Sequence, residues 1–159
     1  MAQQEFAQNI AQILLQARDE IRANMQAKGI NASGRTSAAL QVVQRGSKIE
    51  LIKAQGQNAP FGTLQYGRGR GRVPRGFFYI IQQWTRDKGF NFENEKHRNA
   101  FTAYVVNKVK TEGTNRHRSP RNDIYDEPLA NAVDGIRQEA RKYVLGTIKA
   151  VLESGYASV

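Results

Sequence analysis

The stretch of the chain with the clearest chemical character is a run of alternating glycines and arginines. Residues 61–76 read FGTLQYGRGRGRVPRG, with Tyr66, Arg68, Arg70, Arg72 and Arg75 and no acidic residue among them. Each guanidinium offers a fork of N–H donors that matches phosphate or carboxylate oxygens, and glycines let the backbone approach a partner closely. The tyrosine ring can stack on a base. This run therefore predicts a contact surface for an anion.

Three interpretations of residues 61–76 are open. A nucleic-acid backbone and a neighbouring protein subunit both offer acceptor oxygens to arginine, and a solvated loop without a partner is the third interpretation. A nucleotide-binding loop is not favoured, because it requires a preceding strand, a following helix and a Gly-Lys-Ser/Thr sequence that the run lacks.

A second basic run, TEGTNRHRSPRND at residues 111–123, contributes Arg116, Arg118 and Arg121. It repeats the order of the first run: Gly-Thr is followed by basic and turn-forming residues. Either the two runs lie together in space, or they are alike only because basic surface loops often contain glycine and threonine. Both alternatives are kept open here.

Residues suited to catalysis or metal binding are sparse. Cysteine is absent, and His97 and His117 lack the spacing of metal ligands. Asp123, Asp126 and Glu127 could hold a divalent cation, but capping of the following helix explains them more simply. We expect no catalytic residues, no metal and no cofactor. A small hydrolase or nuclease that depends on Asp123 or Asp126 is the enzymatic alternative.

The composition favours an anionic partner. The chain has 159 residues and a formal net charge of +10, and no acidic residue lies between Glu50 and Asp87. We expect no membrane-spanning segment, since no apolar run approaches the roughly 20 residues needed, and no secretion signal at the start. The length predicts a single domain over residues 1–159.

These basic runs must be positioned by the elements between them. Apolar residues at helical spacing, from Phe6 to Met25, predict a helix over residues 3–27. The apolar residues then recur at every second position. This alternation, with a tight turn at Gly46-Ser47, predicts a β-hairpin over residues 36–54. The glycines and Pro74 predict that residues 61–76 form a loop.

Three further helices are expected. The first covers residues 77–88, where Trp84 and its apolar neighbours predict a buried face, and the second covers residues 94–110. Residues 111–123 form the second basic loop. The last helix runs over residues 127–153. Together these elements predict an α+β fold, in which a small antiparallel sheet is covered by several helices and long helices stand at both termini.

The order of these features resembles the neck and tail-completion proteins of tailed bacteriophages, which connect head and tail. ASGRTSAAL is similar to the family's Thr-Gly-x-Leu-x-x-Ser segment, and APFGTLQYGRGR to its Tyr-Ala-x-x-Glu-x-Gly-Thr segment. FFYIIQQWTRDKGF and AYVVNKVKTEGT resemble the segments that follow. The likeness covers most of residues 1–135. Phe61 stands where the family commonly has an acid, and the helix after Pro128 is longer than the family's closing strands.

The resemblance implies a non-enzymatic virion protein, assembled in the host cytoplasm. It implies a ring of six or twelve identical copies around the DNA channel, in contact with portal, neck or tail proteins and with genomic DNA. The alternative function is an independent, sequence-independent nucleic-acid-binding protein that uses the arginines of both loops.

Overall fold

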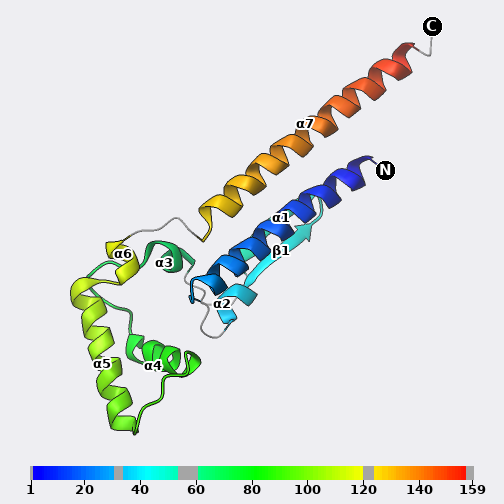
Figure 1. The fold of residues 1–159 in the computed structure, drawn as a ribbon. Helices are drawn as coiled ribbons and strands as arrows, with labels where there is room; N and C mark the ends of the chain where they lie inside the picture. The colour runs from blue at the N-terminus through cyan, green and yellow to red at the C-terminus, as the bar shows by residue number, and fades with distance from the viewer. Residues whose placement is uncertain (1, 31–33, 54–60, 120–123, 157–159) are drawn as a thin grey trace.

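The computed structural model describes residues 2–30, 34–53, 61–119 and 124–156. Two long helices, α1 (Ala2–Ala27) and α7 (Asp126–Tyr156), lie side by side and antiparallel (Figure 1). Both termini are therefore at one end of this pair, and the helices α4 and α5 lie at the other end. The helices predicted over 3–27 and 127–153 are confirmed, and α7 continues to Tyr156.

The β-hairpin packs against α1. Its strands, β1 (Leu40–Arg45) and β2 (Lys48–Lys53), pair antiparallel with Val42 opposite Leu51. Gly46 has φ +61° and occupies the first central position of the two-residue turn, as in a type II′ hairpin.

The prediction that the hairpin starts at residue 36 was wrong. Residues Arg35–Ala38 form a short helix, α2, and the strand begins only at Leu40. The guanidinium of Arg22 donates hydrogen bonds to the carbonyls of Ser37 and Leu40, at 3.0 and 2.9 Å. This side chain from α1 therefore satisfies carbonyls at the end of α2 and the start of β1. Residue 54, the predicted end of the hairpin, lies outside the described residues.

The first basic run is not a loop throughout. Residues Phe61–Tyr66 form helix α3, and the irregular segment begins at Gly67. Leu64 packs against the core and Gln65 is fully buried, so tertiary contacts hold this short segment as a helix. The dense alternation of glycine that prevents regular structure starts only after Tyr66.

Helices α4 (Phe77–Asp87) and α5 (Glu95–Glu112) pack together through aromatic rings. Trp84 is half-buried and lies 5.3 Å from Phe90, whose ring also contacts Phe101 at 5.6 Å between centroids. One detail of the buried face predicted for residues 77–88 was wrong, because Ile80 is exposed. A two-helix unit has room to bury only one side of each helix, so the wider apolar faces are not fully covered.

The second basic run also contains a helix. Residues Asn115–Arg118 form α6, which Thr114 caps by accepting a hydrogen bond from the amide of His117. The prediction of a loop over 111–123 was therefore wrong for residues 111–112, which end α5, and for 115–118. Residues 120–123, and with them Arg121 and Asp123, lie outside the described residues.

The main core lies where α1, the hairpin, α3 and the start of α7 meet. Ile21, Met25, Leu40 and Ile124 are buried together there. Arg35 and Asp87 form an ion pair of 2.8 Å that joins α2 to the end of α4. The α+β class with a two-stranded antiparallel sheet and long terminal helices is confirmed, and helices α1 and α2 pack against this sheet. In the part of the chain that the structure describes, no helix is both long and apolar enough to cross a bilayer.

Candidate nucleic-acid and subunit interface

The two basic runs contact each other through their backbones. The amide of Arg68 donates to the hydroxyl of Thr114 at 2.8 Å, and the amide of Thr114 donates to the carbonyl of Arg68 at 2.8 Å. Gly71 donates to the carbonyl of Lys110, also at 2.8 Å. Of the two alternatives left by the sequence, juxtaposition is therefore confirmed. We call the paired segments 67–76 and 110–118 the clasp.

Two glycines permit this close pairing. Gly67 has φ +73°, and a Cβ placed on it would lie 2.3 Å from the backbone nitrogen of His117. Gly113 has φ +77°, and its Cβ would lie 2.7 Å from the carbonyl oxygen of Arg68. Both distances are too short for any side chain, and both φ values disfavour L-residues. Gly67 and Gly113 are thus needed for packing of one segment on the other.

Several of the predicted contact arginines are engaged within the chain. Arg68 is half-buried; its guanidinium donates to the carbonyl of Arg72 at 2.8 Å and lies 5.7 Å from the ring centre of Phe77. Arg118 forms an ion pair with Glu112. Sequence reasoning missed this partner, although Glu112 lies only six residues before Arg118 in the same run.

Arg70, Arg72 and Arg75 are the exposed arginines of segment 67–76. Among the described residues, no hydrogen bond or ion pair occupies their guanidinium groups. They project from a segment whose backbone is tied to α5 and to Thr114, so their positions are restricted before any partner binds. Tyr66, also exposed, ends α3 just before this segment. These residues fit an oxygen-rich partner surface better than Arg68 or Arg118 does.

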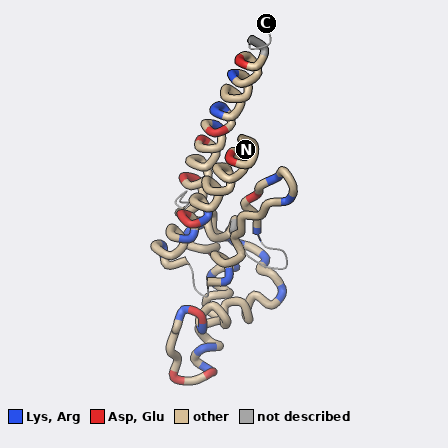
Figure 2. Tube along the Cα trace, turned by 90° about the vertical axis from the view of Figure 1, so that its right-hand side faces the viewer, with Lys and Arg blue, Asp and Glu red and all other residues tan. Residues whose placement is uncertain are grey.

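The positive charge of the chain is not confined to the clasp. Lysines and arginines also occur along the hairpin, α5 and α7 in the trace of Figure 2, where acidic residues lie between them. Three ion pairs on α7 illustrate this, namely Arg137 with Asp134, Lys142 with Glu139, and Lys149 with Glu153. Segment 67–76 is distinctive because it contains no acid at all.

Gln65 links the clasp to the start of α7. Its side chain is fully buried; the oxygen accepts from the amide of Tyr125 at 2.9 Å, and the nitrogen donates to Asp126 Oδ1 at 2.5 Å. Asp126, considered from sequence as a possible cation ligand, is thus an acceptor within the chain. No group of three or more His, Asp or Glu side chains in the described ranges is arranged to hold a metal ion. No pattern in the sequence indicates this role of Gln65, since an isolated glutamine in LQY is ordinary in type and spacing.

Arg116 and Tyr125 lie beside this bridge. Burial raises the pKa of the Tyr125 phenol to about 12, and the positive charge of Arg116 partly opposes that shift. Arg116 is half-buried and has interactions within the chain. We therefore assign it to the support of the clasp, rather than to the exposed set.

A second candidate surface lies on the last turns of α7. Val144, Leu145, Ile148, Val151 and Leu152 are all at least half exposed, up to 67% for Leu145. Their spacing places them on one side of the helix. We call these five residues the α7 apolar face. This face lacks cover because α1 packs on the opposite side of α7, through residues such as Ala132 and Tyr143.

Comparison of the chain with protein-family models, with curated proteins and with solved structures found no match. The functional interpretation therefore depends on the clasp, on the α7 apolar face and on the sequence segments described above.

Proposed function

We propose that this chain is a structural subunit of the head-to-tail connector of a tailed bacteriophage, where copies form a ring around the DNA channel. The observation that carries the proposal is the α7 apolar face. Five adjacent large aliphatic side chains are exposed on one side of a helix end. Contiguous apolar surface of this kind marks an interaction site rather than ordinary protein surface.

Together with the resemblance to neck and tail-completion proteins, such a surface favours assembly into a ring. A head-to-tail contact between identical copies closes into a ring when its rotation divides a full turn. The resemblance of segments 32–40, 59–70, 77–90 and 103–114 to neck and tail-completion proteins implies six or twelve copies, located in the virion beside portal, neck or tail proteins.

The clasp supports a DNA-facing role within this ring. Arg70, Arg72 and Arg75 are held on a segment without acids, and repetition around a ring multiplies their charge. A ring of these arginines that faces the channel contacts phosphates without reading bases. Its contribution to the DNA affinity weakens as the salt concentration rises, by about 0.9 log unit per log unit of salt for each phosphate neutralised. If the arginines face outward, they meet acidic neighbouring proteins instead.

Two measurements test the proposal. The mass of the purified protein in solution should correspond to a closed multimer, and mass spectrometry of purified phage particles should detect the chain. A chain that stays monomeric at high concentration and is missing from particles would rule the proposal out.

The alternative is an independent, sequence-independent nucleic-acid-binding protein, and the three exposed arginines of the clasp favour it. Replacing Arg70, Arg72 and Arg75 together by glutamine should then weaken binding to DNA at low salt, and should reduce the log–log salt slope by about 0.9 per lost phosphate contact. The control carries the same loss of charge at exposed positions elsewhere, at Arg45, Arg86 and Lys96. Equal effects of the two triple variants would show that net charge, and not the clasp, determines binding.

A further inference from the structure

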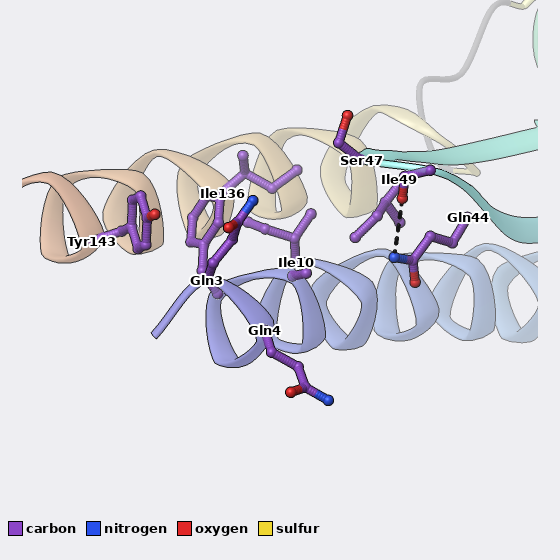
Figure 3. Close-up of a pocket in the computed structure, with 11 residues that line it drawn as sticks. Gln3, Gln4, Ile10, Gln44, Ser47, Ile49, Ile136 and Tyr143 are labelled. Carbon is purple, nitrogen blue, oxygen red and sulfur yellow. Dashed lines mark hydrogen bonds between the residues drawn. The ribbon is translucent and has the colours of Figure 1, made fainter. Parts of the chain in front are cut away.

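A groove opens between α1, the turn of the hairpin and α7 (Figure 3). Its volume is about 780 Å³. Phe6 and Ile10 of α1 line one wall, Ile49 lines the hairpin wall, and Ile136 and Tyr143 line the α7 wall. None of the lining side chains is charged. The groove can therefore receive an apolar side chain without leaving a charge buried and unpaired.

The α7 apolar face matches the groove in chemistry. Within residues 144–152 the one charged side chain is Lys149, which lies at the edge of the apolar face, four residues after Leu145, and pairs with Glu153 at 3.7 Å. The five residues of the face and the side chains that line the groove are uncharged, and both surfaces leave aliphatic side chains in water. Bringing them together removes apolar area from water on both sides.

The face cannot fill the groove of its own chain. Tyr143 lines the groove, and Val144, the first residue of the face, directly follows it on the same helix. α7 is continuous from Asp126 to Tyr156 and extends beyond the N-terminal end of α1 (Figure 1), whereas the groove is lined by its residues Ile136 and Tyr143. The α7 apolar face can therefore reach such a groove only on another copy.

Copies could meet by pairing two α7 apolar faces or by placing the face of one copy in the groove of another, and the surface area that each arrangement buries favours the second. The face covers nine residues, which is about 13 Å of helix. Pairing two such faces side by side covers an area on the order of 13 by 10 Å, far below the roughly 800 Å² that each partner contributes to a stable interface. A helix end inside the groove is contacted by α1, the hairpin and α7 together and also brings the bodies of the two copies into contact.

A lipid surface fits the face less well. Helices that lie in a membrane interface carry lysine and arginine on the polar side and favour aromatic residues on the apolar side. The polar side of α7 alternates both signs, as in the pairs Lys142–Glu139 and Lys149–Glu153, and the α7 apolar face is aliphatic only.

We propose that the α7 apolar face of one copy occupies the groove of the next copy. This inference rests on the proposed ring, and it names the contact that builds it. Each copy uses one face and one groove, which are different surfaces, so the contact is heterologous and continues from copy to copy until the ring closes. The longer C-terminal helix of this chain is then the connecting arm.

Engineered disulfides test the contact directly, because the chain has no cysteine of its own. A variant with Gln44→Cys at the rim of the groove and Ile148→Cys on the face should form a ladder of linked multimers under mild oxidation. The matched control pairs Ile148→Cys with Arg72→Cys in the clasp and should give no ladder. Dimers formed by Ile148→Cys alone would show that two faces pair with each other and would overturn the inference.

A second variant separates this inference from the proposed function. Ile148→Asp places a charge on an already exposed position, so the fold and the helical signal by circular dichroism should be retained while the multimer dissociates. Ala150→Asp, which adds the same charge at an exposed position on the opposite side of α7, should keep the multimer. If the unmodified chain forms rings that survive Ile148→Asp and give no ladder, the inference fails and the ring remains. If the unmodified chain is monomeric, or floats with anionic vesicles without self-association, both fail.

Discussion

Replacing Gly67 by alanine should open the clasp. The residue has φ +73°, and the added Cβ would meet the backbone nitrogen of His117 at 2.3 Å. Backbone cannot rotate away as a side chain can, so the two segments must separate. Separation breaks the hydrogen bonds between Arg68 and Thr114, which are both 2.8 Å long in the intact clasp.

The magnitude follows from two contributions. The left-handed conformation costs an alanine about 1–2 kcal/mol, and each lost hydrogen bond costs about 1 kcal/mol. Gly67→Ala should therefore lower the free energy of unfolding by roughly 3–4 kcal/mol. Gly76 is the matched control, since its φ of +75° is nearly the same and a Cβ there meets nothing within 4 Å. Gly76→Ala should cost only about 1–2 kcal/mol.

Urea unfolding of the two variants measures this difference, and hydrogen exchange locates it. The amides of Gly71 and Thr114, which donate across the clasp, should lose protection in Gly67→Ala and keep it in Gly76→Ala. Equal unfolding free energies for the two variants, with both amides still protected, would refute the packing of segment 67–76 on segment 110–118.

Four further substitutions test residues of the fold and of the clasp. Gln65→Leu leaves the Tyr125 amide and the Asp126 carboxylate without their buried partner, and chemical denaturation should show a loss of about 2–3 kcal/mol. Trp84→Ala should lower the free energy of unfolding by about 2–3 kcal/mol, which is less than the roughly 3–5 kcal/mol expected for a fully buried ring, because Trp84 is half-buried. Arg70→Ala, at an exposed position, should change it by no more than about 0.5 kcal/mol. Thermal melts of the two variants measure the difference. The pKa of Tyr125 is raised to about 12 from the ordinary 10.0, so its contribution to stability is complete below pH 10 and is lost as the pH rises towards 12. Tyr125→Phe should remove this part of the loss of stability at alkaline pH. An equal decrease in the free energy of unfolding of both proteins across this pH range would contradict the raised pKa of Tyr125.

Helices with strong periodicity were predictable from the sequence, and short segments held by tertiary contacts were not. The stripe from Phe6 to Met25 fixes α1 within one residue, and Gly46 marks the hairpin turn. Helix α3 contains a glycine and no helical stripe. It is helical because Leu64 and Gln65 are buried against residues from other elements, which local sequence does not encode.

The candidate surfaces were predictable in composition but not in detail. Glycine and arginine at alternating positions marked segment 67–76 as a candidate contact element, and the shared Gly-Thr suggested its pairing with the second run. Which arginines are held within the chain depends on the folded geometry: Arg68 lies over the ring of Phe77, and Arg118 pairs with Glu112. Exposure of the α7 apolar face depends on which side of α7 is covered by α1, and an apolar stripe alone does not show this.

The proposed function requires that copies of this chain join into a closed ring. Electron microscopy of the purified protein, imaged over a series of concentrations, tests it most directly. Rings of one size, with six or twelve copies and the α7 helices at the contacts between neighbours, are expected. Single elongated particles at every concentration would contradict the claim.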